Sequence, residues 1–392
     1  MNLRGALSAC AFALLAGQAS GQAGRGPWLA PQDAQDALAQ SDAYAWKLFI
    51  ALNWPADARA RGADPTATFG VDRPVVWETW QNAAEVYRAD GGDPGPWTLG
   101  TPRPAVADEE RFETASLKDL PNLRHVAQGR MAPFDDPVAA ARRLTEIRMN
   151  RAAFEYIRAR ALYNVEGQLH AAAAGGVAFP ADAIEVKAQW RPVTAQERGR
   201  YHTLEVRLAD GQRRLYGLTA LHIISKTLPQ WFWATFEHVD NATLADAEGW
   251  QLPSRDRLAC PPQRPDCNRA PAGIGLEGTV WQFYRLRGTM TGFLEDDGQP
   301  ARLANSALEK GMQASSSCIT CHARASIGLA GDTPVRLPVF ESVAPRAAGG
   351  FERRGYVGLP DAAWFEKAAA GARFWPLDSV WSLSLAKPKR GS

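Results

Sequence analysis

The sequence predicts an α+β protein, in which an antiparallel β-meander domain with flanking helices is followed by a small helical lobe. Three observations lead to this fold class. Residues 184–239 alternate apolar and polar side chains in short runs, helical patterns precede them, and residues 300–392 again contain helical stretches. We therefore divide the chain into a mixed α/β domain over residues 24–299 and a smaller C-terminal region over residues 300–392.

The meander is predicted from four consecutive runs. Residues 184–191 alternate without a break, and residues 202–208 do the same. The dipeptide Asp210-Gly211 then gives a strong hairpin signal, after which the chain returns over residues 214–225 and again over residues 231–239. Sequential strands joined by short turns pair antiparallel. We expect this sheet to be the rigid platform of the larger domain.

Helices are predicted before the meander. Residues 43–53 form an apolar run with almost no polar face, which indicates a buried helix. A second helix is expected to begin at Asp136-Pro137, because Asp is a good cap and Pro is favoured at the first helical position. The apolar stripe of this second helix is Leu144, Ile147, Phe154 and Ile157.

The motif that carries chemistry is Cys318-Ile319-Thr320-Cys321-His322. Two cysteines three apart, with a histidine directly after the second, form the pattern of covalent haem attachment. Residues i and i+3 share one face of a helical turn, so both thiols can reach the two vinyl groups of one porphyrin while the histidine points at the iron. Serines 315–317 can supply the N-cap of this turn, and residues 303–313 are expected to form a flanking helix.

This motif resembles those of c-type cytochromes, and the chain is identified as a member of that broad class. The resemblance covers only the motif and its flanking helix. It implies one covalently bound haem c, thioether bonds to Cys318 and Cys321, and His322 as the proximal iron ligand, in a cytochrome c-like haem lobe. Residues 221–241 also resemble a segment of large, mostly uncharacterised bacterial cytochrome-like proteins, which implies a shared architecture but no particular reaction.

Two other uses of the cysteine pair are less favoured. A thioredoxin-like Cys-x-x-Cys follows a strand and opens a helix, whereas the residues before Cys318 have a helical pattern. A structural zinc site needs four ligands, and no second ligand pair lies nearby in the sequence. Haem attachment is therefore the preferred interpretation.

The N-terminus has the pattern of a secretory signal peptide. Arg4 supplies a positive charge, residues 6–17 form a short apolar run, and small residues favour cleavage after Ala19 or Ala23. We expect residues 1–23 to be a signal peptide and the mature protein to lie in the periplasm. Cys10 also fits a lipoprotein box, but the apolar run continues beyond it. No later run is long enough for a transmembrane segment.

The remaining cysteines and the charge balance narrow the possibilities further. Of five cysteines, Cys260 and Cys267 are left for a local disulfide, with two free thiols as the alternative. Closing so short a loop contributes about 2–3 kcal/mol on the chain-entropy model. The 44 basic and 42 acidic residues give a net charge of only +2, so no nucleic-acid partner is expected.

The motif leaves the sixth ligand of the iron open. In the small soluble cytochromes that the motif resembles, this ligand is commonly a downstream methionine, but no methionine follows His322. His222 and His238, in the predicted strands, are therefore the candidate distal ligands. Each shares a strand face with apolar residues, so a core histidine with a satisfied hydrogen bond is the alternative for both. The other candidates are His202, Met290, Met312 or no protein ligand.

Two classes of function follow. The first is a periplasmic electron-transfer protein, with six-coordinate iron that exchanges electrons with a redox partner protein. The second is a haem enzyme, such as an oxidoreductase, or a small-ligand sensor, with an open or labile distal site. The abundance of single-motif electron carriers favours the first class, while the chain length and the missing methionine favour the second. We place electron transfer first.

Overall fold

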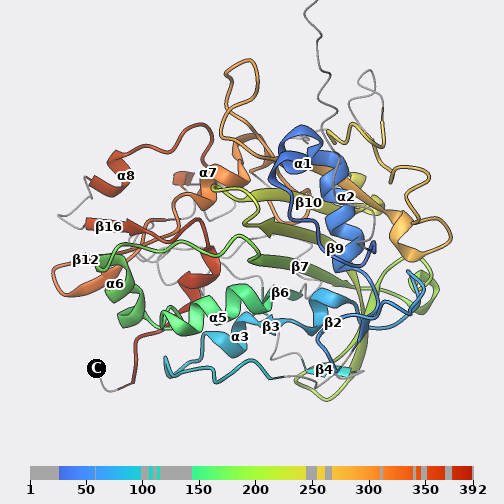
Figure 1. Ribbon diagram of the computed structural model, residues 1–392, viewed down its shortest axis with the longest axis horizontal. Helices are drawn as coiled ribbons and strands as arrows, with labels where there is room; N and C mark the ends of the chain where they lie inside the picture. The colour runs from blue at the N-terminus through green and yellow to red at the C-terminus, as the bar shows by residue number, and fades with distance from the viewer. Residues whose placement is uncertain are drawn as a thin grey trace, which may run out of the picture.

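The structure is a computed structural model of the 392-residue chain (Figure 1). It describes residues 26–57, 59–98, 106–108, 113–114, 144–243, 254–260, 267–309, 312–338, 341–345, 351–366 and 373–390. The predicted signal peptide over residues 1–23 and the predicted helix start at Asp136-Pro137 lie outside these ranges. Helices and antiparallel strands occur together, which confirms the α+β class.

The largest sheet of the described residues has nine strands, and its main path runs in the order β11-β10-β9-β7-β6-β3. The strands on this path are β3 (Gln81–Asn82), β6 (Leu144–Met149), β7 (Ile184–Pro192), β9 (Arg213–Ser225), β10 (Phe232–His238) and β11 (Tyr284–Met290). Three short strands attach beside this path: β4 (Val106–Asp108), β5 (Glu113–Thr114) and β8 (Thr203–Arg207). Every described pair in this sheet is antiparallel except β4 with β8.

The four predicted strands all form, but they do not make a simple meander. Strand β7 pairs with β9 and not with β8, the next strand along the chain. Strand β9 has 13 residues, and its two ends pair with different neighbours: β8 with its first half and β10 with its second half. Gly217 pairs with both Arg191 of β7 and Thr203 of β8, so these two strands lie on opposite edges of β9. The length of β9 allows this arrangement.

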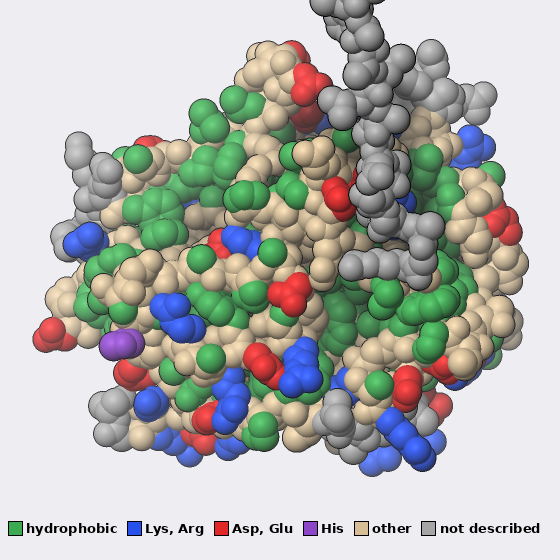
Figure 2. Space-filling view, viewed as in Figure 1, with side chains coloured by type: hydrophobic (Ala, Val, Ile, Leu, Met, Phe, Trp, Pro, Cys, Tyr) green, Lys and Arg blue, Asp and Glu red, His purple; other side chains and the backbone are tan. Residues whose placement is uncertain are grey.

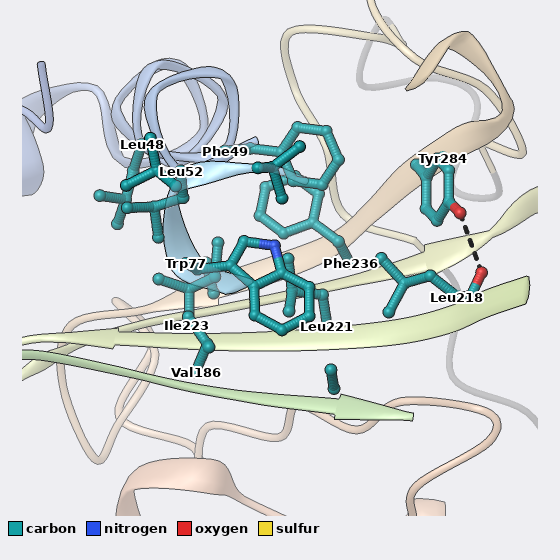
Figure 3. Close-up of a cluster of buried hydrophobic side chains, with 14 of the residues drawn as sticks. Leu48, Phe49, Leu52, Trp77, Val186, Leu218, Leu221, Ile223, Phe236 and Tyr284 are labelled. Carbon is teal, nitrogen blue, oxygen red and sulfur yellow. Dashed lines mark hydrogen bonds between the residues drawn. The ribbon is translucent and has the colours of Figure 1, made fainter. Parts of the chain in front are cut away.

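One face of the sheet packs against α2 (Ser41–Leu52), which follows α1 (Ala34–Ala39). Figure 3 shows Leu48, Phe49 and Leu52 of α2 directed at the strands, with Trp77 and Phe236 beside them. The rings of Phe49 and Phe236 have centroids 4.4 Å apart. The predicted buried helix over residues 43–53 is thus confirmed, two residues longer at its start and one shorter at its end.

The other face of the sheet is covered by the C-terminal part of the chain. A second apolar cluster combines Trp233 of β10 and Met290 of β11 with Ile319, Leu377 and Leu383. In Figure 1, α7 lies beside the left end of β10, and β12, β16 and α8 lie farther to the left. The region over residues 300–392 therefore packs directly onto the sheet.

The predicted helical stripe from Leu144 to Ile157 is wrong in its first half. Residues 144–149 are strand β6, paired with β7, and the helix α5 (Arg151–Ala159) starts only after Asn150. The Asn150 side chain caps α5 by accepting a hydrogen bond from the backbone N–H of Ala153 at 3.0 Å. Strand β6 pairs with β7 on one side and with β5 and β3 on the other, and this backbone hydrogen bonding overrides the helical spacing.

The remaining elements are short. Before and within the sheet they are β1 (Ala56–Asp57), β2 (Gly62–Ala63), α3 (Ala83–Val86) and α6 (Val165–Ala173). After it come α7 (Cys318–His322), β12 (Ser326–Ala330), β13 (Thr333–Val335), β14 (Glu341–Pro345), β15 (Phe351–Arg354), α8 (Ala363–Glu366) and β16 (Arg373–Pro376). Among the described residues of 300–392, only α7 and α8 are α-helical, so the predicted helix over residues 303–313 is wrong and the predicted small helical lobe is not shown.

Candidate functional site

The motif cysteines and histidine form the single-turn helix α7. Ser317 occupies the N-cap position, but its hydroxyl does not cap the helix. It donates instead to the sulfur of Met290 at 3.4 Å, and the same sulfur accepts from the backbone N–H of Ile319 at 3.5 Å. The sulfur of Met290, on β11, therefore caps the start of α7 in place of the predicted serine hydroxyl. It also anchors α7 to the sheet.

Both thiols of the motif are free in the structure. Cys318 is partly buried and Cys321 is buried, and neither is joined to another cysteine. Their sulfur atoms have only weak hydrogen-bond partners, the carbonyl of Leu303 for Cys318 and the backbone of Tyr356 for Cys321. Burial raises the pKa of both thiols, so they are protonated at neutral pH. Two neutral thiols thus lie on one turn, as covalent haem attachment requires.

His322 is held in one tautomer. Its Nδ1 lies 2.9 Å from the carbonyl oxygen of Ser379, and because a carbonyl only accepts, Nδ1 carries the proton. Burial lowers the pKa of His322 to about 3, so the ring is neutral and Nε2 keeps its lone pair. No described residue forms a hydrogen bond to Nε2. Metal-binding histidines have this arrangement: one ring nitrogen donates a hydrogen bond that fixes the orientation of the ring, and the other ring nitrogen is left to bind the metal.

The carbonyl that orients His322 comes from an unusual turn. Asp378 and Ser379 both have positive φ, 49° and 63°, which non-glycine residues seldom adopt. The Asp378 carboxylate accepts from Lys226 Nζ at 2.6 Å and from the backbone N–H of Phe179 at 2.7 Å, and its carbonyl accepts from Trp231 at 2.8 Å. These bonds to the sheet domain hold the turn, so the Ser379 carbonyl is aimed at His322 by contacts outside the motif.

Trp233 and Trp381 complete the surroundings of the motif. The ring of Trp233, on β10, lies with its centroid 4.5 Å from that of His322. Trp381 donates its indole N–H to the Cys321 carbonyl at 3.0 Å, which satisfies a backbone acceptor near the end of α7. The motif therefore lies against the sheet face that carries Trp233.

That sheet face has an opening beside the motif. Ile147, Lys187, His222 and Thr235 are directly opposite one another on β6, β7, β9 and β10, so they form one row across this face. Lys187 is exposed although it is central in the sheet, and Ile147 and His222 are partly exposed, whereas both neighbours of Lys187 along β7 are buried. The row lies close to the motif, because its member Thr235 is two residues from Trp233 on β10, and the ring of Trp233 contacts that of His322.

His222 pairs with Glu309 from the segment before α7. Its Nε2 lies 3.2 Å from Glu309 Oε1, and the second carboxylate oxygen accepts from the backbone N–H of Asn305 at 2.7 Å. Burial acts to raise the pKa of Glu309, but His222 and Asn305 lower it on balance, so Glu309 is a carboxylate. The imidazole therefore donates from Nε2, and no described residue forms a hydrogen bond to its Nδ1.

The other candidate histidines lie on the opposite face of the sheet. His238 stacks on Tyr201 with centroids 3.6 Å apart, and both ring nitrogens are occupied: one by the Arg200 carbonyl at 3.0 Å, the other by the Asp240 N–H at 3.2 Å. His202 lies 3.0 Å from Glu78 and stacks on Trp281. Of the three candidate histidines, the structure places only His222 on the face that carries the motif.

Comparison of the chain with protein-family models, with curated proteins and with solved structures finds no match. The function has to be inferred from the site itself. Among the described residues, no group of three or more His, Cys, Asp or Glu side chains could hold a metal ion. No helix in the described ranges has the length and apolar character to cross a membrane.

The structure also pairs Cys260 with Cys267, with Cα atoms 5.8 Å apart and a disulfide between them. This is the pairing expected from the sequence. Within the residues that the structure describes, the two motif thiols are the remaining cysteines.

Several residues of the site could not have been picked out from the sequence. Ser379 is 57 residues from His322, Met290 is 29 residues from Ile319, and Glu309 is 87 residues from His222. None of them belongs to a short motif. The one local signal was the excess of polar residues on alternate positions of β7, which marks the face toward the motif.

Proposed function

We propose that the chain is a periplasmic monohaem c-type cytochrome that transfers electrons through a haem bound covalently to Cys318 and Cys321. The observation that supports this most strongly is the state of His322, because its protonated Nδ1 is fixed by the Ser379 carbonyl while Nε2 is left available on the same turn as two free thiols. A chance Cys-x-x-Cys-His in a loop would not need such an orienting contact.

Attachment uses ordinary thiol chemistry. Each cysteine adds its S–H across one vinyl double bond of the porphyrin: a C–S bond forms, the proton ends on the neighbouring vinyl carbon, and no net oxidation or reduction occurs. Both thiols must be reduced beforehand, which matches the free Cys318 and Cys321 of the structure. His322 would hold the iron through Nε2, which keeps its lone pair because the proton is on Nδ1.

The row of Ile147, Lys187 and His222 is where a macrocycle attached to α7 is expected to lie. It is the part of the motif-bearing sheet face that is open to solvent. Figure 2 also shows hydrophobic side chains gathered over α7 and the segments next to it, a surface suited to an apolar ring or to a partner. The bound haem supplies one-electron oxidation and reduction, while Trp233 and Trp381 keep water from the His322 side.

The open row also favours a second candidate function. An exposed Lys187 beside His222 and Glu309 would let a small molecule approach the distal side of the iron, as in a haem-dependent oxidoreductase or a ligand sensor. The two functions differ in whether a protein group occupies the sixth iron position.

The proposal is tested by secreting the chain from a bacterium that attaches haem c and measuring intact mass under denaturing conditions. We expect one haem on the wild type, one haem on Cys318→Ser or Cys321→Ser through the remaining thioether, and none on the double variant. The matched control is Cys260→Ser with Cys267→Ser, which removes a sulfur pair away from the motif and keeps the haem. A wild type without haem, or a double variant that retains it, would overturn the proposal.

A further inference from the structure

We infer that His222 is the second axial ligand of the haem iron, binding through Nδ1, and that Glu309 is the residue that positions it. This inference rests on the proposed function, since it needs a haem at α7. It selects a six-coordinate iron with two imidazole ligands, and hence an electron carrier over an open-site enzyme.

The first argument is the similarity between the two histidines. In His322, Nδ1–H donates to the Ser379 carbonyl and Nε2 is available; in His222, Nε2–H donates to the Glu309 carboxylate and Nδ1 is available. Iron-binding histidines are oriented by such a hydrogen bond on the other ring nitrogen. Two imidazoles with this arrangement on one sheet face form a matched pair of potential ligands.

The second argument is their placement. His222 extends from the second half of β9 and lies opposite Thr235 of β10. His322 contacts Trp233, which is two residues from Thr235 on β10 and on the same face of the sheet. His222 also belongs to the partly open row, with its side chain 16% exposed. A ligand from the sheet and a ligand from α7 can therefore approach a flat macrocycle from its two sides.

Glu309 connects this ligand to the attachment site. Its Oε2 accepts from the Asn305 N–H, and its own N–H donates to the Asn305 carbonyl at 3.0 Å, so one closed turn fixes the carboxylate. Asn305 donates to Thr235 and to the Phe236 carbonyl of β10, both at 3.0 Å. The carboxylate is thus anchored to β10, which pairs directly with β9, the strand that carries His222.

The competing side chains are engaged elsewhere or are less suitable. Met290 uses its sulfur to receive the N–H of Ile319 at the start of α7. His202 and His238 lie on the far face of the sheet. Lys187 is the one other potential ligand in the row, but no described carboxylate, carbonyl or hydroxyl orients its exposed amine.

The test uses full-length secreted holoprotein and the spin state of its iron. The wild type should be low-spin in the ferric and ferrous forms, and its ferrous form should not bind added carbon monoxide promptly. His222→Ala should become high-spin and bind carbon monoxide at once, and added imidazole should restore the low-spin spectrum. His222→Met, which retains a ligating side chain, should stay six-coordinate with a raised reduction potential. The matched control His170→Ala, at an exposed histidine of α6, should behave as wild type.

Glu309 is tested by the potential and the spectrum. Glu309→Gln should keep the iron low-spin but raise the reduction potential, because it removes the negative charge that is hydrogen-bonded to His222. Glu309→Ala should give a mixture of high-spin and low-spin iron, since the ring is no longer oriented. A Glu309→Ala spectrum and potential identical to wild type would overturn the positioning role.

The outcomes separate this inference from the proposed function. If haem is attached but His222→Ala leaves the spectra and the carbon monoxide reaction unchanged, His222 is not a ligand, although the cytochrome proposal stands. If Lys187→Ala, and not His222→Ala, produces the high-spin form, the inference is overturned in favour of an amine ligand. If no haem is attached to the wild type, the proposed function itself fails.

Discussion

Replacing Glu237 with Gln is expected to lower the free energy of unfolding by about 3–5 kcal/mol. Glu237, Arg285 and Arg287 have exposed fractions of 0, 0 and 1%. The Glu237 carboxylate accepts from Arg285 Nε at 3.0 Å and lies 3.5 Å from Arg287, so it neutralises charge that water cannot reach. A neutral amide would also place an N–H group among donors. Urea unfolding followed by fluorescence measures the change.

This carboxylate also holds the segment that precedes the Cys318–His322 motif. It accepts from the backbone N–H of Ser306 at 2.9 Å and from its hydroxyl at 3.1 Å, which ties the segment before α7 to β10. We therefore expect Glu237→Gln to reduce haem attachment as well as stability. The control is Glu205→Gln, which breaks an exposed pair with Arg213 and should change stability by less than about 1 kcal/mol. Equal stability of the Glu237 and Glu205 variants would contradict the account of a buried ion network.

Replacing Glu185 with Gln is expected to stabilise the protein at pH 8 by about 3 kcal/mol. The side chain is buried between Met149 and Ile224, and burial raises the pKa of Glu185 from 4.5 to about 7, opposed only by a hydrogen bond from Ser382 at 3.0 Å. The folded state therefore keeps the Glu185 proton up to about pH 7, whereas the unfolded state releases it near pH 4.5, and at pH 8 the folded state has to bury the charged carboxylate. Gln keeps an oxygen to accept from Ser382 and has no charge to bury.

The direction in which stability changes with pH follows from the two pKa values of Glu185. Between about pH 4.5 and pH 7 the folded state binds more protons than the unfolded state, so the wild type loses stability as the pH rises, and above pH 7 the loss is complete. The curves of wild type and Glu185→Gln should meet near pH 4 and separate toward pH 8. Glu155→Gln, at an exposed residue of α5, should run parallel to the wild type. The measurement is the free energy of unfolding across this pH range. A Glu185→Gln curve that ran parallel to the wild-type curve would disprove the account.

The strands could be predicted from the sequence, but the segments that pack on each of their faces could not. The alternation over residues 184–191 predicts β7 and separates Val186 and Ala188 from Glu185, Lys187 and Gln189. It also suggests that the polar set faces water. In the structure Glu185 and Gln189 are buried, because the C-terminal region covers that face. Periodicity reports two faces of a strand, and only the tertiary fold decides what lies on each.

The failed helix predictions are explained by tertiary contacts. Over residues 303–313 the composition favours a helix, but Asn305 uses its side chain to accept from the N–H of Ala307 at 2.9 Å and to bond β10. One closed turn forms in place of a helix. For residues 144–149, pairing with β7 prevails over a spacing that fits a helix equally well. Both outcomes depend on partners far away in the sequence.

Some residues of the candidate site could be predicted from the sequence, whereas others are brought together only by the fold. The spacing of the two cysteines and the histidine predicts that they share one helical turn, and α7 confirms this placement. The Ser379 carbonyl, the Met290 sulfur and the turn at Asp378 could not, since each is brought to the motif by the fold. His222 and His238 looked equivalent in the sequence, and only the assignment of sheet faces distinguishes them.

The most direct test of the central claim is the mass of the secreted wild-type chain after denaturation and alkylation. Covalent haem predicts the mature chain plus one haem, with no alkylation at Cys318 or Cys321. A chain with no added porphyrin, and with both of these thiols alkylated, would contradict it.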